Sequence, residues 1–254
     1  DSFLPPNIEN ETPCNITIEI KKDLKGDLEL QYELTNYYQN HRRYGYSKVD
    51  EQLAGQYVGF SDMSKCSPYR SEDDKRDESF WILPCGLFPN STFNDTFELD
   101  IPNALSFTDK GIAYDSEIND LYKPLSDQYK VGDKWLENSI FGENGKISEH
   151  FMVWMRQSAL PHIVKTYKKC DNCEIKAGNY TLQVWSRYPT DTFEGEKYFT
   201  IAKITKLGTH NTYIGISFLI CAGLSGAYGL VLVVAEIVSP RLMGFDPGQE
   251  DMET

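Results

Sequence analysis

The sequence has few basic residues for its acidic content. Its 254 residues include 25 lysines and arginines against 38 aspartates and glutamates, and the formal net charge is −13. Nucleic acids and anionic lipid headgroups attract proteins with excess positive charge. The deficit therefore argues against nucleic-acid binding and against simple adhesion to an anionic membrane. Many secreted, solvated surfaces are equally acidic, so the charge identifies no partner.

Signatures of catalysis and cofactor binding are also missing. The chain has no G-x-G-x-x-G, Walker A or H-E-x-x-H motif and no internal repeat. His41 precedes two arginines, but no Ser, Cys or carboxylate stands beside it in a recognised catalytic pattern. Asp73 and Asp74 belong to the run SEDDKRDES, which is typical of a solvated loop and not of a catalytic cleft. A luminal hydrolase is thus the weakest hypothesis, and we expect no catalytic residue, metal or cofactor.

The first residues lack the basic and apolar segments of a signal peptide. Residues 1–6 read DSFLPP, which we interpret as the start of a truncated or processed chain. Of six cysteines, Cys221 lies in an apolar run and is expected to be a free thiol. Five remain, so in an oxidising compartment one has no partner within this chain. The missing cysteine would lie upstream of residue 1.

Two cysteine pairs are candidates for disulfide bonds. Cys66 and Cys85 bracket a charged loop, and closing about 20 residues is worth about 3 kcal/mol in the chain-entropy account. Cys170 and Cys173 form a C-x-x-C pair. A zinc site would need a second ligand pair and a thioredoxin-like site would need a βαβ context, and neither is present. We therefore predict a local disulfide at this second pair.

An apolar run from Asn211 to Ala235 contains no Asp, Glu, Lys, Arg or His. A helix needs about 20 mainly apolar residues to cross a hydrocarbon core of about 30 Å. The run therefore predicts a transmembrane helix, assigned to residues 208–236. Small residues four apart on a helix let a partner helix approach closely. The candidate packing positions are Ala222, Gly223, Ser225, Gly226, Ala227 and Gly229.

Flanking charges leave the orientation of this helix open, because Lys203 and Lys206 precede it and Arg241 follows it. Five N-x-S/T sequons all precede the helix, and such sites are glycosylated on the luminal or extracellular side. The sequons are at Asn10, Asn15, Asn90, Asn94 and Asn179. We therefore expect residues 1–207 to form an ectodomain in the lumen or outside the cell, and residues 237–254 to form a cytosolic tail.

Alternating polar and apolar residues predict strands in the ectodomain. They occur at Cys14–Ile20, Leu28–Leu34, Asn179–Tyr188 and Lys197–Ile204. The segment Lys25-Gly26-Asp27 predicts a turn between the first two strands, which we expect to form a hairpin or to lie as neighbouring antiparallel strands. Apolar residues at helical spacing predict a helix within Phe151–Lys169, which Pro161 would kink or restart. The expected fold is an antiparallel, mainly β ectodomain with one or two helices, plus the membrane helix.

Nine stretches, in the same order, resemble the cell division control protein 50 and ligand-effect modulator 3 family. The segments NHRRY and NSTFNDTF are the most specific of them. The stretches are PCNITIEI (13–20), YELTNYYQNHRRYGYS (32–47), CSPYRS (66–71), PCGLFPNSTFNDTF (84–97), KGIAY (110–114), FMVWMRQSALP (151–161), GNYTLQV (178–184), RYPTDTFEGEKYF (187–199) and SPRLMG (239–244).

This resemblance implies a non-catalytic β-subunit of a type-IV P-type ATPase, a lipid flippase. Members of the family have two spans around an exoplasmic β-sandwich, so the helix here would be the second span. The resemblance also implies the Cys66–Cys85 disulfide and a bond from Cys14 to an upstream cysteine. Assembly with the α-subunit, exit from the endoplasmic reticulum and support of the transport cycle follow, with ATP hydrolysis in the partner. The ectodomain would face the lumen or the cell exterior, in the endoplasmic reticulum, the Golgi or endosomal system, or the plasma membrane.

The chain departs from the family pattern in three places. Residues 207–211 read LGTHN where the family usually has Gly-Gly-Arg/Lys-Asn, the Cys170–Cys173 pair is an addition, and the tail after Gly244 differs. A single-span receptor or adhesion ectodomain that binds an extracellular ligand is the alternative function. A second span upstream of residue 1 would favour the flippase subunit.

Overall fold

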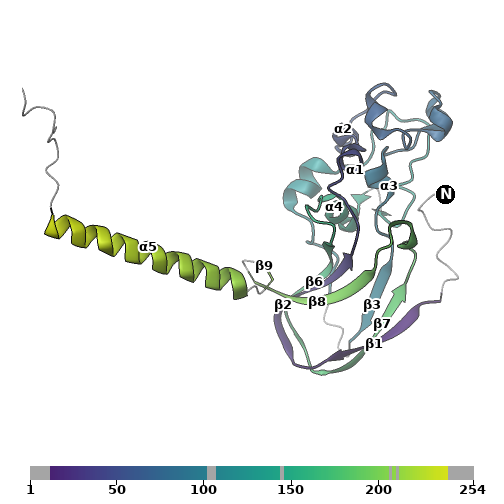
Figure 1. Cartoon of the computed structure of the whole chain (residues 1–254). Coiled ribbons are helices and arrows are strands. Elements are labelled where there is room, and N and C mark those ends of the chain that lie inside the picture. Colours follow the sequence, from purple (N-terminus) through teal and green to yellow (C-terminus); the bar gives the residue numbers. More distant parts are fainter. Residues whose placement is uncertain (1–11, 102–106, 144–145, 206–207, 210–211, 240–254) are drawn as a thin grey trace, which may run out of the picture. The chain divides into compact units, whose positions relative to one another are not determined.

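The computed structural model describes residues 12–101, 107–143, 146–205, 208–209 and 212–239 (Figure 1). The chain divides into two units, residues 1–205 and residues 206–254, which are described separately. The sequon at Asn10 lies outside the described residues, as do the departures at residues 207 and 210–211.

The first unit contains two antiparallel sheets, named sheet A and sheet B here (Figure 1). Sheet A has the strand order β1 (Cys14–Ile20), β7 (Gly178–Trp185), β3 (Thr96–Asp100). Sheet B has the order β6 (Ile163–Ile175), β2 (Leu24–Leu34), β8 (Lys197–Thr205). A two-residue hairpin, β4 (Gly142–Glu143) with β5 (Lys146–Ile147), stands apart from both. The prediction of a mainly antiparallel β ectodomain is confirmed.

The predicted pairing of the first two strands, as a hairpin or as antiparallel neighbours, is wrong. β1 pairs with β7 in sheet A, whereas β2 pairs with β6 and β8 in sheet B. Lys25–Asp27 lies within β2, where Gly26 has a φ of 115° next to a register shift. Glycine adopts this left-handed conformation without a steric penalty and is common at β-bulges. The chain instead changes sheet just before β2, where the Asp23 carboxylate accepts a hydrogen bond from the Ala177 backbone.

The apolar core lies between the two sheets, because alternate residues of each strand point inward. Phe97 of sheet A contacts the rings of Tyr167 and Phe199 of sheet B, with centroids 5.1 and 5.3 Å apart. Leu34 and Leu182 are almost completely buried in the same cluster. These contacts fix the two sheets as one sandwich.

The helices of the first unit are short and lie in the connections between strands. They are α1 (Arg42–Tyr46), α2 (Asp50–Leu53), α3 (Leu87–Asn90) and α4 (Glu149–Met155). Single 3₁₀ turns occur at Asp62–Cys66, Glu72–Asp74, Glu78–Phe80 and Asp191–Phe193, and a π turn at Glu117–Leu121. The segment from Leu34 to Thr96 connects sheet B to sheet A and holds most of these turns.

The predicted helix over Phe151–Lys169 is only partly correct. α4 begins at Glu149, where the Ser148 hydroxyl accepts a hydrogen bond from the Phe151 backbone, and it ends at Met155. β6 then begins at Ile163. Proline at position 161 disfavours helix at the preceding residue and cannot donate to a helical ladder. The β-branched residues that follow Pro161 favour the extended conformation.

The second unit contains β9 (Gly208–Thr209) and α5 (Thr212–Val238). The predicted long apolar helix is confirmed, but its bounds differ from the expected 208–236, because Gly208–Thr209 forms a strand and the helix runs from Thr212 to Val238. Its stretch Ile214–Val238 has 25 residues and a mean hydropathy of 2.2. Its length and composition suffice to cross a membrane.

Candidate partner-binding sites

The segment NYYQNH at residues 36–41 forms one wall of an aromatic pocket. Packing against residues 154–161 fixes this segment, since the Tyr37 backbone donates to the Pro161 carbonyl at 2.9 Å and the Asn40 amide donates to the Ala159 carbonyl at 2.8 Å. The fully buried Gln39 side chain donates to the Trp154 carbonyl and accepts from the Ser158 backbone. The wall is therefore preorganised.

The Tyr37 ring stands nearly at right angles to two other rings of this pocket. The Tyr37 ring makes interplanar angles of 88° with Tyr44 and 86° with Phe193. The Tyr37 and Tyr44 hydroxyls are 3.0 Å apart, and the Tyr44 hydroxyl is 2.7 Å from Ser91 Oγ. The cavity has a volume of about 310 Å³. Its lining residues are Asn36, Tyr37, Tyr38, His41, Tyr44, Leu87, Ser91, Tyr188, Thr192 and Phe193.

The pocket is lined mainly by aromatic rings. Burial raises the pKa of Tyr44 and of Tyr188 well above the usual value, so both phenols stay neutral. His41 also lines the cavity, and the Ser91 hydroxyl is engaged with Tyr44 and with backbone carbonyls. This arrangement offers aromatic faces to an occupant.

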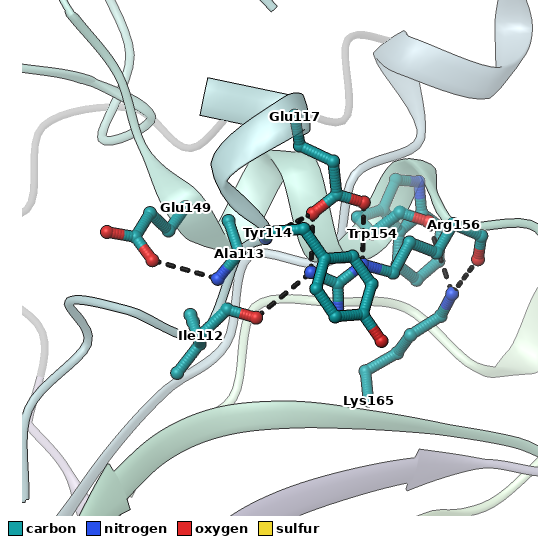
Figure 2. Close-up of polar contacts among 8 residues, drawn as sticks. All are labelled: Ile112, Ala113, Tyr114, Glu117, Glu149, Trp154, Arg156 and Lys165. Carbon is teal, nitrogen blue, oxygen red and sulfur yellow. Dashed lines mark hydrogen bonds and ion pairs between the residues drawn. The ribbon is translucent and has the colours of Figure 1, made fainter. Parts of the chain in front are cut away.

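A second polar cluster joins the KGIAY segment to the end of α4 (Figure 2). The Arg156 guanidinium donates to the Glu117 carboxylate at 2.7 Å and to the Ile112 carbonyl at 3.0 Å. It also lies over the Tyr114 ring, 4.1 Å from the centroid. Burial opposes the ionisation of Glu117, but the hydrogen bonds from Arg156 and the Tyr114 backbone, together with the positive charges of Arg156 and Lys165, lower the Glu117 pKa. The cluster therefore clamps two distant segments together.

Lys165 lies beneath this cluster on the inner face of sheet B (Figure 2). It is 5% exposed, and its ammonium group donates to the Trp154 and Arg156 carbonyls. Burial, reinforced by the nearby Arg156 charge, lowers the Lys165 pKa to about 7. The sequence did not indicate this site, because we expected a helix within Phe151–Lys169 and therefore did not place Lys165 on the inner face of a strand.

The structure places the predicted disulfide cysteines in two different settings. Cys66 and Cys85 are bonded, with Cα atoms 5.7 Å apart, and both are fully buried in a hydrophobic cluster of their own. Cys170 and Cys173 are bonded within β6, with Cα atoms 5.9 Å apart. Cys14 is a free, exposed cysteine at the start of β1, and Cys221 is free and exposed on α5.

The described sequons differ in accessibility. Asn15 and Asn179 are exposed on the outer face of sheet A. Asn90 uses its side-chain nitrogen, the atom that would carry a glycan, to donate to the Pro84 and Gly86 carbonyls. Asn94 is 3% exposed. The structure thus brings together only two of the sequons, on one face.

The acidic pair from the hydrolase hypothesis lies in a solvated loop. Asp74 forms an ion pair with Arg70, which lowers the Asp74 pKa, and Asp73 is 3.3 Å from Lys75. The two carboxylates therefore have separate basic partners and no shared proton. Across the described part of the chain, no group of three or more His, Cys, Asp or Glu side chains could hold a metal ion.

The small residues predicted to pack against a partner helix all lie on α5. Gly223 and Gly226 have open space at the position of a Cβ atom, as does Gly229. The other members of the set are Ala222, Ser225 and Ala227.

Two pocket residues that the sequence did not single out are Tyr188 and Phe193. Both lie in the RYPTDTFEGEKYF stretch, so the aromatic content of that stretch was the available signal.

Comparisons with known proteins agree with the fold and the motifs. The chain is 35% identical over 259 residues to cell cycle control protein 50A of Bos taurus, covering 91% of this chain and 70% of the relative. It is 32% identical over 262 residues to the phospholipid-transporting ATPase accessory subunit CDC50 of Chaetomium thermophilum, covering 94% and 63%. It is 31% identical over 255 residues to the phospholipid-transporting ATPase accessory subunit CRF1 of Saccharomyces cerevisiae, covering the same shares. A family model described as LEM3 (ligand-effect modulator 3) family / CDC50 family matches residues 4–242, and the chain belongs to this family.

Proposed function

We propose that this protein is the non-catalytic accessory subunit of a phospholipid-transporting P4-type ATPase. The observation that carries the proposal is a family match over residues 4–242, with relatives whose names state this role. ATP hydrolysis and lipid transport then belong to the catalytic partner. The accessory subunit supports assembly, exit from the endoplasmic reticulum and the transport cycle.

Its topology follows from the same role. Residues 1–207 form the exoplasmic ectodomain, residues 208–236 cross the membrane and residues 237–254 form the cytosolic tail. The exposed sequons at Asn15 and Asn179 and the buried Cys66–Cys85 disulfide support this assignment, because glycans and stable disulfides belong to the secretory pathway. Cys14 pairs with a cysteine upstream of residue 1. The complex resides in the endoplasmic reticulum, the Golgi and endosomal membranes or the plasma membrane.

The decisive experiment is purification of the full-length protein from native membranes in mild detergent, with mass spectrometry of the bound proteins. We expect a stoichiometric P-type ATPase. A protein that purifies alone, or with a soluble extracellular ligand, would exclude the accessory role and support the receptor alternative.

The small residues of α5 form the helix-packing part of the interface in this proposal. Gly226→Leu fills the space that a close helix approach needs, so we expect less ATPase to co-purify. Leu224→Phe adds bulk on the opposite side of the helix and serves as the matched control. If both variants recover as much ATPase as the wild type, the face of α5 that contains Gly226 does not belong to the interface.

A further inference from the structure

We infer that the aromatic pocket and the exposed apolar side chains around it form a docking surface for the ATPase catalytic subunit. An uncharged side chain from an exoplasmic loop of that subunit enters the pocket. The inference rests on the proposed function and assigns a surface to it.

The pocket has the features of an anchor site in a protein interface. Binding energy in interfaces concentrates where a bulky side chain fills a preformed, desolvated pocket. The walls here are rigid aromatic rings, held by the hydroxyl contacts from Tyr37 to Tyr44 and from Tyr44 to Ser91. A second brace is the hydrogen bond from the Tyr188 hydroxyl to the Ser91 carbonyl at 3.0 Å. The mainly aromatic lining favours an apolar or aromatic occupant, which packs against the ring faces.

Large apolar side chains are exposed beside this pocket. Tyr38, which lines it, is 54% exposed, and Leu160 is 67% exposed next to Pro161, the hydrogen-bond partner of Tyr37. Val164 and Tyr198 are exposed as well and lie in one row across the outer face of sheet B, on either side of Glu33. Clustered apolar exposure of this kind marks interaction surfaces.

The carboxylate in that row is already satisfied. Glu33 accepts hydrogen bonds from His162, at 2.7 Å, and from the Thr200 hydroxyl. A partner that covers this row therefore does not strip an unpaired carboxylate of its water. The desolvation cost that weakens many polar interfaces is correspondingly reduced.

The two sequons that the structure leaves exposed lie on the other sheet. Asn15 and Asn179 both point outward from sheet A, at positions four residue pairs apart along β1 and β7. A glycan on either one would obstruct a protein partner. A partner therefore finds the outer face of sheet B and the pocket accessible.

Charged residues adjoin the lining residues in the chain. Arg42 and Arg43 follow His41, whereas Asp191 and Glu194 flank Thr192 and Phe193, and all four charged residues are exposed. A complementary segment presents an apolar or aromatic anchor between an acidic group and a basic group. Such an arrangement fixes orientation and selects among partners.

The test is co-purification of the ATPase catalytic subunit with the full-length chain. The single variants Tyr38→Ala and Leu160→Ala each remove an exposed apolar group beside the pocket. A third variant, Thr192→Trp, fills the pocket. We expect each change to reduce the recovered ATPase at least tenfold. Tyr57→Ala and Leu121→Ala are the matched controls, because both side chains are exposed to a similar degree and neither lines the pocket. These controls should recover the ATPase at the wild-type level.

The outcomes separate the two claims. A wild-type chain that recovers no P-type ATPase rejects the accessory role itself. If the wild-type chain recovers the ATPase and all three pocket variants recover it equally well, the docking surface is rejected and the accessory role stands. The same conclusion follows if the control variants lose as much ATPase as the pocket variants. Unfolding temperatures of the purified variants, measured in parallel, should remain at the wild-type value.

A photo-crosslinking residue provides a readout that does not depend on affinity. With the probe at Tyr38 we expect a crosslink to an exoplasmic loop of the ATPase, identified by mass spectrometry. With the probe at Tyr57 we expect none. A crosslink from Tyr57 and not from Tyr38 would overturn the inference.

Discussion

Sheet A and sheet B share one core but differ in what they place on each face. The inward positions of sheet A are apolar, as Ile18, Leu182 and Phe97 illustrate. Sheet B places two lysines among its inward positions: Lys165 opposite Tyr32, and Lys197 opposite Leu34. Sheet A completes the core, whereas sheet B also fixes the long connections through polar contacts.

The lysines of sheet B hold specific segments in place. Lys165 donates to carbonyls at the end of α4, and Lys197 donates to Asp95 at 2.6 Å and to the Tyr188 carbonyl at 2.9 Å. Asp95 in turn accepts from the Tyr188 backbone, beside the aromatic pocket. The outer faces differ too, since exposed sequons lie on sheet A and satisfied carboxylates on sheet B. Sheet B therefore holds the end of α4 and the segment around Tyr188 in place, whereas sheet A has no such role among these contacts.

The largest expected effect is the loss of the buried ion pair next to sheet B. Arg156→Ala leaves the Glu117 carboxylate, only 6% exposed, without its partner. Removing one member of a buried pair typically costs about 3–5 kcal/mol, because the remaining charge is neither hydrated nor paired. Urea denaturation of the ectodomain should show this loss as a lower midpoint.

The control for this change is an ion pair of similar geometry at the surface. Arg70→Ala breaks the pair with Asp74, whose side chain is 56% exposed, and should cost at most about 1 kcal/mol. If Arg156→Ala and Arg70→Ala proved equally mild, the cluster near sheet B would not clamp the fold, and the contrast between the sheets would fail.

The next largest loss of stability is expected in the segment from Leu34 to Thr96, which connects the two sheets. Cys66→Ala opens a disulfide that closes a loop with a sequence separation of 19 residues, which should cost about 3 kcal/mol. Because the bond belongs to a separate hydrophobic cluster, we expect the loss to be local. Hydrogen exchange should rise around Trp81 and Tyr129 while β2 and β7 keep their protection. Uniform deprotection of both sheets would show that the connection does not fold as its own unit.

The strands and the membrane helix were predictable because their signals are local. Alternation placed four strands near their observed bounds, and a charge-free run located α5. Strand partnership was not local, and the expected hairpin failed because the bulge at Gly26 resembles a turn in sequence. The order of strands depends on the sum of contacts across the core, which periodicity does not encode.

The pocket and the Arg156 cluster could not be predicted from the sequence, for the same reason. Tyr37 and Phe193 are 156 positions apart, and Glu117 and Arg156 are 39 apart. Tyr37, Phe193 and Arg156 belong to motifs that were recognised, yet the spacing does not indicate that these motifs meet, and Glu117 lies outside them. The helix expected over Phe151–Lys169 also hid Lys165, since helical spacing gave no reason to place a lysine inward.

A subtler effect is a pH dependence that originates in sheet B. The Lys165 pKa is about 7 in the folded protein against 10.5 ordinarily, because burial and the Arg156 charge disfavour the ammonium, while Glu117 partly offsets them. Between these two values the unfolded chain binds more protons than the folded chain. Stability therefore rises with pH from about 7 towards 10.5, and the full cost of the buried charge is present below pH 7.

Lys165→Met isolates this contribution. The difference in unfolding free energy between wild type and Lys165→Met should shift in favour of the wild type as pH rises through this window. A control, Lys169→Met, removes a less buried lysine of the same strand and should leave the pH slope unchanged. A wild-type slope identical to that of Lys165→Met would mean that sheet B tolerates the charge and that the contrast with the apolar inner face of sheet A has no energetic consequence.

The smallest expected effect on stability comes from the outer face of sheet A. Asn179→Gln should remove one glycan, seen as a single mass step, while stability stays within about 0.5 kcal/mol because the side chain is exposed. Asn90→Gln should leave the glycan mass unchanged, since the Asn90 nitrogen is engaged with the Pro84 and Gly86 carbonyls. Losing those two bonds should still lower stability by about 1–3 kcal/mol. A glycan on Asn90, or a bare Asn179, would reverse the assignment of glycans to sheet A and remove one reason for placing the partner at sheet B.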